Sequence, residues 1–543
     1  MSLEAAAAPL DTQSYLNAGA RAGASDNGKP SLTIDEAASQ LLRGEPGWSA
    51  ALGQPFNITY AYRSSAPAMP SDTGGFQAFS TAQIQATELA LKAWSDVANI
   101  TFTRMGVGTA GAAAYSNNAA ILFGNYTTGE AGSSAFSFFP GSVATASEAG
   151  DVWINSTYSY NASPVMGGYG FLVLVHEVGH AIGLEHPSDY NAADGTTLTY
   201  AANAGYYQDD LQYTVMSYFA ESNTGANFGA DYPAAPMLDD IAAAQLAYGA
   251  NMSTRTGDTV YGFHANADAP WFIANSAGSR LVFAAWDAGG VDAFDFSGFA
   301  QNQLIDLRAG SFSNVGGLVG NVAVAQRVMI ENAVGGTGSD VIHGNAAGNT
   351  IDGGAGADTL DGGSAGRNQL FGGDGADSIA GGADFDQVNG NKGEDTIDGG
   401  AGGDDWLLGG QGDDLILSRA GFTILNGNIG RDTVTGGSGA DVVRGGQGDD
   451  LLNAGAGDDQ LFGDLGNDLM TGGAGADVFH FAPDGGVDRI LDFVPGEDRI
   501  QLDGIVSYNL SQAGPDAVIA VGADQIVVAN TSANALGGSI LLA

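Results

Sequence analysis

The stretch at residues 176–186, HEVGHAIGLEH, places three imidazoles and one carboxylate at a spacing typical of a catalytic metal site. His176 and His180 are four residues apart, so on a helix both side chains project from one face and can bind the same ion. Gly183 can adopt a positive φ, which lets the helix end and the chain turn back, and His186 then supplies a third ligand. Three protein ligands leave a zinc ion an open position for water, as in catalytic zinc sites.

Glu177 follows the first histidine, so its carboxylate lies beside a bound metal and is the candidate general base. The preceding residues predict a buried helix, because an apolar stripe runs from Phe171 to Val178 and no proline interrupts it before Pro187. The alternative is a buried helix with capping histidines and no metal. We disfavour it because three of the six histidines of the chain fall within this stretch.

The charge balance of the chain limits its partners. The 543 residues include 61 acidic and 17 basic side chains, a formal charge of -44, which makes nucleic acid and anionic membrane surfaces poor partners. A hydrophobic content of 44% argues against disorder of the whole chain. The absence of cysteine excludes disulfides, thiolate ligands and a cysteine-switch propeptide. No signal peptide is expected at residues 1–10, and no apolar run approaches the ~20 residues of a membrane span.

The chain is expected to begin with a mobile segment or propeptide remnant at residues 1–30, followed by an α+β domain at residues 31–251. Apolar periodicity predicts helices at residues 31–42, 81–99 and 238–248, in addition to the helix of the histidines. Alternating patterns predict strands at residues 56–62, 100–104, 120–123, 134–139 and 151–154.

From Gly335 the sequence becomes periodic. The unit GGTGSDVIH at residues 335–343 recurs as GGAGADTLD at residues 353–361, and further units begin at Gly372, Gly436, Gly445 and Gly472. The 146 residues from 335 to 480 accommodate about sixteen units of nine residues, two of them lengthened by one residue near Gly362 and Gly399. Units 381–389, which contains Phe385, and 418–426, which lacks the turn glycines, are degenerate.

The repeated unit predicts a calcium-binding parallel β-roll at residues 335–480, with two units in each coil. Glycines let a turn curl with its carbonyls inward, the sixth position adds an Asp carboxylate, and the eighth carries an aliphatic side chain for a thin core. Without metal the carboxylates repel, so we expect calcium to control folding. A solvated acidic linker is the alternative, which the long periodicity disfavours. The candidate ligands are Gly336, Gly338, Asp340, Gly354, Gly356, Asp358, Asp377, Asp395, Asp414, Asp432, Asp441, Asp450, Asp459, Asp468 and Asp477.

The stretch YTVMSY at residues 213–218 follows the histidine motif by some thirty residues. A tight turn there would place Met216 beneath the three imidazoles as a hydrophobic floor. Tyr218 could then reach the zinc or the scissile carbonyl oxygen, which makes it both a candidate zinc ligand and a candidate catalytic residue. Taken alone, Met216 would be read as core packing and Tyr218 as a buried aromatic.

Together, residues 176–190, residues 216–218 and the repeat array resemble the serralysin family of RTX zinc metalloproteases, which belong to the metzincins. Residues 238–241, 253–262 and 285–290 strengthen the resemblance. It implies a secreted endopeptidase with one catalytic zinc, several structural calcium ions and broad protein and peptide substrates. It also implies export by a type I secretion apparatus that reads an uncleaved C-terminal signal. The strand at residues 134–139 resembles the edge of the family's cleft, where substrate adds as an extra strand.

The resemblance also implies further calcium sites and boundaries. A β-rich connection at residues 252–334 would hold interdomain calcium, and a β-rich cap at residues 481–543 would carry the secretion signal. A protease inhibitor of the periplasm or cell surface is a further expected partner, and the chain is expected to be a monomer. The implied calcium ligands are Arg255, Gly257, Thr259, Asp287, Gly289, Gly290 and Asp292, with Glu331 in a neighbouring site.

Two features depart from the family pattern. The repeat array is longer than expected, and the ending SILLA at residues 539–543 is apolar without an acidic residue. A second hypothesis is therefore a calcium-dependent surface or adhesion protein with a vestigial protease domain. The intact Glu177 favours the enzyme, because a binding module has no need of that carboxylate. The remaining histidines, His264, His343 and His480, are expected at the surface.

Overall fold

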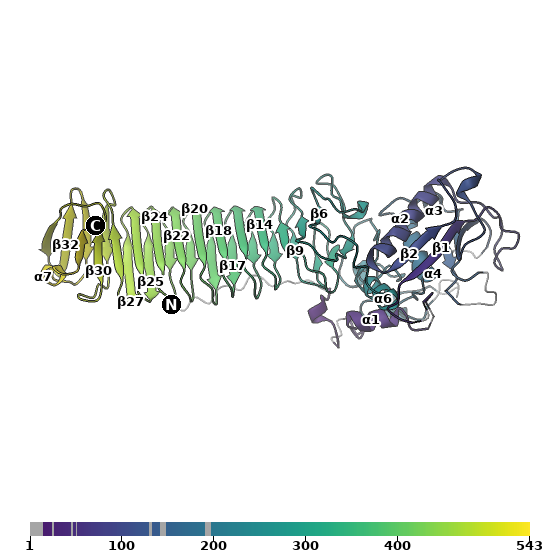
Figure 1. Cartoon of the computed structure of the whole chain (residues 1–543), viewed down its shortest axis with the longest axis horizontal. Coiled ribbons are helices and arrows are strands. Elements are labelled where there is room, and N and C mark those ends of the chain that lie inside the picture. The colour runs from purple at the N-terminus through teal and green to yellow at the C-terminus, as the bar shows by residue number, and fades with distance from the viewer. Residues whose placement is uncertain are drawn as a thin grey trace. The chain divides into compact units, whose positions relative to one another are not determined.

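The computed structural model describes residues 15–23, 27–44, 47–49, 51–129, 133–141, 148–190 and 197–542 (Figure 1). Residues 1–14 and 24–26 of the expected N-terminal segment lie outside the described residues. The chain forms two compact units. The first consists of Met1–Asp292 and Arg308–Ile330, and the second of Ala293–Leu307 and Glu331–Ala543. The predicted fold class, an α+β domain followed by a parallel β-roll, is confirmed.

The first unit contains a five-stranded sheet in the order β2-β1-β3-β5-β4. Its members are β1 (Phe56–Tyr62), β2 (Ile100–Arg104), β3 (Ile121–Tyr126), β4 (Ala135–Ser137) and β5 (Val152–Asn155). Four of the strands are parallel, and β4 runs antiparallel to β5. Every residue of β3 and β5 is buried, as expected for the centre of a covered parallel sheet. Among the described strands β4 lies at the edge of the sheet and pairs only with β5, so one of its sides is available for pairing with respect to these strands.

Four helices of the first unit are α1 (Ile34–Gln40), α2 (Thr81–Val97), α4 (Tyr169–Ala181) and α6 (Leu238–Tyr248). Capping boxes at Thr33 and Ser80 fix the first turns of α1 and α2. The helix α2 packs against α4, and the indole of Trp94 donates a hydrogen bond of 2.9 Å to the carbonyl of Val175. The short helices are α3 (Ser159–Ala162) and α5 (Tyr200–Asn203).

The rest of the first unit is built from short strands. They are β6 (Val260–Gly262), β7 (Phe283–Ala285), β10 (Phe312–Ser313) and β11 (Val322–Val324), of which the last three form a sheet in the order β10-β11-β7. Among the described helices of the chain, none is long and apolar enough to cross a membrane.

The second unit is a β-roll whose successive strands alternate between two parallel sheets (Figure 1). The first sheet contains β8 (Ala293–Asp295), β12 (Asn332–Val334), β14 (Thr350–Ala355), β16 (Gln369–Asp374), β18 (Gln387–Lys392), β20 (Trp406–Gln411), β22 (Ile424–Ile429), β24 (Val442–Gln447), β26 (Gln460–Leu465), β28 (Val478–Phe481), β30 (Arg499–Leu502) and β34 (Ile540–Leu542). The second contains β9 (Leu304–Asp306), β13 (Val341–His343), β15 (Thr359–Asp361), β17 (Ser378–Gly382), β19 (Thr396–Gly400), β21 (Leu415–Leu417), β23 (Thr433–Thr435), β25 (Leu451–Ala456), β27 (Leu469–Ala474) and β29 (Val487–Ile490).

Strand register shows where the two lengthened units lie. Equivalent positions of successive coils pair with one another: Thr350 pairs with Gln369 and Gln387 with Trp406, whereas Gln369 pairs with Gln387. The first two pairs are separated by 19 residues along the chain and the third by 18, so two coils are one residue longer. This confirms the predicted insertions near Gly362 and Gly399. The eighth position of each unit fills the core with side chains at most 2% exposed, such as Ile342, Leu407, Val443 and Phe479.

The C-terminal part closes the roll with antiparallel strands. The hairpins of β31 (Asn509–Ala513), β32 (Asp516–Val521) and β33 (Asp524–Val528) join the second sheet through the pairing of β33 with β29. The helix α7 (Ala533–Leu536) precedes β34. The expectation that His480 is a plain surface residue is wrong, because its ring stacks on Phe462 at 4.2 Å and its Nδ1 lies 2.9 Å from Asp503 Oδ2.

Candidate metal centre and active site

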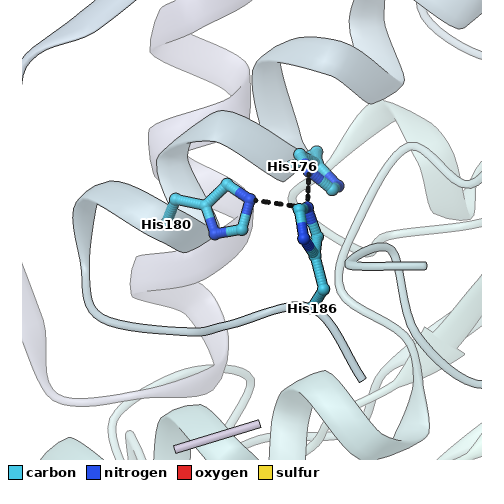
Figure 2. Close-up of side chains that lie close together, drawn as sticks. All are labelled: His176, His180 and His186. Carbon is cyan, nitrogen blue, oxygen red and sulfur yellow. Dashed lines mark hydrogen bonds between the residues drawn. The ribbon is translucent and has the colours of Figure 1, made fainter. Parts of the chain in front are cut away.

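The structure brings His176, His180 and His186 together (Figure 2). The Nε2 atoms of His180 and His186 are 3.1 Å apart, and those of His186 and His176 are 3.3 Å apart. Each Nδ1 faces a backbone carbonyl, at 2.8 Å for His176, 2.7 Å for His180 and 3.0 Å for His186. Because a carbonyl only accepts hydrogen bonds, each Nδ1 carries the proton and each Nε2 presents a lone pair. Three lone pairs converging at this distance repel one another, and a cation between them removes the repulsion.

Burial keeps these imidazoles neutral, the form that binds a metal. It lowers the pKa of His176 to about 4, and burial together with the nearby His176 lowers that of His186 to about 3. The pKa of His180 is lowered well below its ordinary value, mainly by burial. Within the described part of the chain, no other group of three or more His, Cys, Asp or Glu side chains has ligand atoms close enough to share an ion. The donor set therefore fits zinc.

The turn after α4 delivers the third histidine. Gly183 has φ of 103°, and the N–H of Leu184 donates to the carbonyl of Gly179 at 2.9 Å, which closes the end of the helix. A non-glycine residue would be strained at that φ. The sequence-based expectation for Gly183 is thus confirmed.

Glu177 is buried beside the histidines and held by a residue from the edge strand. Its Oε2 accepts a hydrogen bond of 2.6 Å from Ser137 Oγ, which also donates to the main-chain carbonyl of Glu177 at 3.0 Å. Burial raises the pKa of Glu177 to about 7, against the opposing effect of the Ser137 hydrogen bond. A carboxyl group with this pKa can both accept and release a proton near neutral pH.

Met216 and Tyr218, two residues apart in the stretch 213–218, differ in their exposure. Met216 is fully buried, and its sulfur packs so closely on Gly179 that a Cβ there would overlap it. The ring of Tyr218 lies 4.4 Å from that of His186 and 5.6 Å from that of His176, and the side chain is 40% exposed. The exposed tyrosine can therefore meet a substrate at the metal, whereas the methionine supports the helix from within.

Two buried carboxylates, those of Asp240 and Asp209, hold this arrangement, and neither was among the predicted site residues. Asp240 accepts hydrogen bonds from Thr214 Oγ1 at 2.5 Å and from the N–H of Val215 at 2.7 Å, and the carbonyl of Val215 accepts the proton of His176. Burial raises the pKa of Asp240 to about 7. The sequence placed Asp240 in a predicted helix and in a segment that carries the family resemblance, but its hydrogen-bond partners are set by tertiary contacts.

Asp209, the second of these carboxylates, joins the loop of the third histidine to the tyrosine turn. It accepts hydrogen bonds from Ser188 Oγ at 2.6 Å, from Tyr190 Oη at 2.7 Å and from Ser217 Oγ at 2.9 Å. Tyr190 in turn stacks on His186 at 5.3 Å and offers its carbonyl to that imidazole. Through Tyr190, Asp209 helps to position His186, and through Ser217 it helps to position the backbone next to Tyr218.

Two hollows border the histidines and the edge strand β4. One of about 280 Å³ is lined by Tyr169, Leu172, Val173, His176 and Glu177 of α4, by Leu211 and Tyr232, and by Ser133, Ser134 and Ser217. The other, of about 360 Å³, runs along residues 135–139 and includes Glu177, His180, His186 and Tyr218. Both hollows are bordered by Ala135, Glu177 and Tyr218, so a chain lying along β4 would pass the histidines.

The residues implied for calcium in the first unit gather around two loops. Asp292 Oδ1 accepts the N–H of Thr259 at 2.8 Å, and Asp287 accepts hydrogen bonds from Gly289 N at 2.9 Å and Tyr261 Oη at 2.7 Å. A Cβ on Gly290 would overlap the carbonyl of Gly257. The side chain of Arg255 instead donates to the carbonyl of Trp286, so only its backbone is available to an ion. Glu331 belongs to the second unit.

The aspartates of the roll form ladders along its turns. One carboxylate oxygen accepts the backbone N–H of the residue 18 or 19 positions earlier, as between Asp414 and Asp395 or between Asp432 and Asp414. The other oxygen is buried with no hydrogen-bond partner in the described protein at Asp358, Asp377, Asp386, Asp395, Asp414, Asp432, Asp450, Asp459, Asp468 and Asp477. Buried oxygens without donors suit calcium. Asp386 was not among the predicted ligands, although it holds the sixth position of its unit.

Two predicted ligands differ from this pattern. The second oxygen of Asp340 accepts the N–H of Gly336 at 2.6 Å, and that of Asp441 accepts the N–H of Gly437 at 3.0 Å. These two carboxylates therefore close their own turns and do not offer a free oxygen to an ion in this conformation.

Comparison with known proteins agrees with both units. Residues 57–218 match the matrixin family model, residues 250–401 match the C-terminal model of the M10 serralysin peptidases, and segments within residues 400–479 match the RTX calcium-binding nonapeptide repeat. The chain is 47% identical to metalloprotease AprA of Pseudomonas entomophila over 61% of its own length and 67% of the relative. It is 44% identical to serralysin C of Dickeya chrysanthemi over 59% and 66%.

A solved structure, the extracellular lipase LipA from Serratia marcescens, shows 19% identity over 40% of this chain and 41% of that chain, with a TM-score of 0.20 that supports no inference.

The fold and the site define a metzincin-type zinc metalloendopeptidase with a calcium-binding repeat domain. The chain belongs to the serralysin family of RTX metalloproteases. Family membership implies a catalytic zinc ion and several calcium ions.

Proposed function

We propose that the chain cleaves peptide bonds at the site of the three histidines, with Glu177 as general base and acid. The observation that carries this proposal is the convergence of three Nε2 lone pairs beside a buried carboxylate whose pKa lies near 7. A zinc ion held by His176, His180 and His186 would polarise the scissile carbonyl and lower the pKa of a bound water towards ~7.

The protein groups then have separate tasks. Glu177 Oε2 takes a proton from the attacking water and later delivers it to the leaving amine. Ser137 orients that carboxylate through its hydrogen bond. Tyr218, exposed beside His186, donates its hydroxyl to the oxygen on which negative charge develops, or occupies the metal before substrate arrives. Met216 keeps the turn packed under α4.

Substrate binding is best explained by the edge strand. The free side of β4 can add an extended peptide through main-chain hydrogen bonds, which recognise any sequence and favour broad specificity. The hollow next to His176, whose walls carry Leu172, Val173 and Leu211 together with three tyrosines and three serines, can accept a side chain of the substrate. Protein and peptide chains are the substrates that this geometry supports.

We assign the calcium ions to the unpartnered aspartate oxygens of the roll and to the loops around Asp287 and Asp292. Because such a roll needs calcium to neutralise its carboxylates, the enzyme would fold and act outside the cell, where calcium is plentiful. Export by a type I apparatus that reads residues 481–543, control by a proteinaceous inhibitor, and a monomeric state belong to this proposal. So do the boundaries 1–30, 31–251, 252–334 and 335–480.

Metal reconstitution tests the proposed site. The protein is stripped of zinc in the presence of calcium, so that the roll stays folded, and zinc is then titrated back while casein hydrolysis is followed. We expect activity to return in proportion to zinc and to saturate at about one ion per chain. Full activity in zinc-free protein would refute the proposal.

A further inference from the structure

The two edges of the roll are not equivalent. Turns that lead from the first sheet to the second, named here the exit edge, carry aspartate at the sixth position in every coil: Asp340, Asp358, Asp377, Asp395, Asp414, Asp432, Asp450 and Asp468. Turns that lead back to the first sheet are named here the entry edge. At the equivalent position most of these turns also carry aspartate, but three carry Asn349, Asn368 or Thr423 instead. Thr423 pairs its hydroxyl with Ser418 at 2.8 Å, so this turn has no carboxylate at that position for an ion.

Aromatic side chains lie along the entry edge between Asn368 and Thr423, in coils whose own entry turns keep Asp386 and Asp405. Trp406 is 49% exposed and Phe422 is 43% exposed. The rings of Phe385 and Trp406 meet edge to face at 6.1 Å, and the guanidinium of Arg367 lies 5.7 Å from the ring of Phe385. These four residues are named here the aromatic patch. Large exposed rings are costly in water, so a cluster of them on one edge indicates a binding surface.

Strand register places polar side chains beside the rings. Gln369, Gln387 and Trp406 pair in consecutive strands of the first sheet, so their side chains follow one another on the same outer face. Arg367, Phe385 and Phe422 each lie two residues before the start of a strand of this sheet. Consecutive coils are separated by ~4.8 Å, close to the length of one sugar unit along an extended polysaccharide. Phe385 and Phe422 lie two coils apart in one row with Asp404 between them, and Trp406 lies in the next row beside Gln387. Rings and amides in this arrangement can contact the apolar faces and hydroxyl groups of pyranose sugars.

Charge restricts the choice of ligand. The carboxylates of Asp384 and Asp404 are exposed in the same turns, and the whole chain carries a formal charge of -44. An anionic polysaccharide, a nucleic acid or an anionic membrane would be repelled, whereas neutral sugar hydroxyls can donate to these carboxylates. We propose that the aromatic patch binds an uncharged polysaccharide and so attaches the protease to a glycan-rich surface. This function is separate from peptide hydrolysis.

Affinity electrophoresis of the full-length, calcium-loaded protein tests the proposal. Native gels would contain hydroxyethyl cellulose, a neutral glucan or a neutral mannan, with alginate as the anionic comparison. The variants are Trp406→Ala and Phe422→Ala, and the matched control is Leu451→Ala, which removes an equally exposed side chain (43%) from the second sheet. Circular dichroism and casein hydrolysis verify that each variant is folded and active.

We expect at least one neutral polysaccharide to retard the wild-type protein and the control equally. Each patch variant should lose about tenfold in apparent affinity, as for an aromatic contact at the centre of a binding surface. Equal retardation of the folded Trp406→Ala and wild-type proteins would overturn the proposal. So would retardation by alginate alone, or by none of these polysaccharides.

Discussion

Ser137 Oγ donates a hydrogen bond of 2.6 Å to Glu177 Oε2, and the two residues come from different elements, the edge strand β4 and the helix α4. The strand that is proposed to bind substrate therefore also orients the carboxylate that is proposed to move the proton. If substrate pairs with β4 as proposed, one strand would position both the peptide and the carboxylate that acts on the water.

Removal of the Ser137–Glu177 hydrogen bond by Ser137→Ala should shift the acid limb of the profile of kcat/KM against pH to higher pH. The Ser137 hydrogen bond lowers the pKa of Glu177, which burial raises to about 7, so in Ser137→Ala that pKa should rise further. Because the base must be deprotonated, kcat/KM should fall at pH 6 by a larger factor than at pH 8. The measurement is kcat/KM against pH, with Ser134→Ala as control. Parallel profiles for wild-type protein and Ser137→Ala would contradict the assignment.

Tyr218→Phe removes only the hydroxyl that is proposed to meet the developing oxyanion. We expect kcat to fall by about 10²-fold with a small change in KM and full zinc content, as when one oxyanion donor is lost. Steady-state kinetics with zinc analysis measures this. A variant with unchanged kcat would show that the tyrosine only packs against His186.

Asp209→Asn should lower the affinity for zinc, although Asp209 is not one of the three histidine ligands. The amide replaces a carboxylate that accepts from Ser188, Tyr190 and Ser217, so the loop that carries His186 loses its anchor. We expect zinc affinity to fall by about 10–100-fold, the usual effect of disturbing groups that orient ligands. Competition with a zinc chelator measures the affinity. Wild-type affinity in the folded variant would show that Asp209 contributes to stability alone.

The calcium-free roll should be most stable in acid. Burial raises the pKa of Asp358, Asp414 and Asp450 to about 7, while in the unfolded chain these groups titrate near ~4. The folded state then binds more protons between these values, so unfolding free energy is greatest below pH ~4 and falls as pH rises through ~7. Thermal melts by circular dichroism in chelator should give a Tm that decreases from pH 4.5 to pH 7.5.

Calcium should reverse that trend, because ionised carboxylates bind the cation. The gain in Tm on adding calcium is therefore expected to be larger at pH 7.5 than at pH 4.5. A chelated protein whose Tm rises with pH would contradict the assignment of the unpartnered aspartate oxygens.

The sequence predicted what depends on local spacing. His176 and His180 share a helical face by their spacing alone, Gly183 must turn the chain, and the nine-residue period sets the coil of the roll together with its two insertions. These features follow from backbone geometry over a few residues, which a pattern of residue types records directly.

Contacts between distant segments could not be predicted. Ser137 lies 40 residues from Glu177, and Asp209 lies 19 residues from Tyr190, with no periodic signal to join either pair. The turns of Asp340 and Asp441 look like calcium turns in sequence, but their carboxylates bond to their own backbone. Only the folded structure distinguishes a carboxylate oxygen that is open to an ion from one that already accepts a hydrogen bond.

Replacing Glu177 by glutamine tests the central assignment, because glutamine keeps the size of the side chain and an acceptor for Ser137 but cannot take a proton. The measurement is kcat/KM for casein hydrolysis by the zinc- and calcium-loaded wild-type and Glu177→Gln proteins, with zinc content and melting temperature determined on the same samples. We predict a loss of about 10²–10⁴-fold with unchanged zinc content and folding. Equal activity of the two proteins would contradict the account.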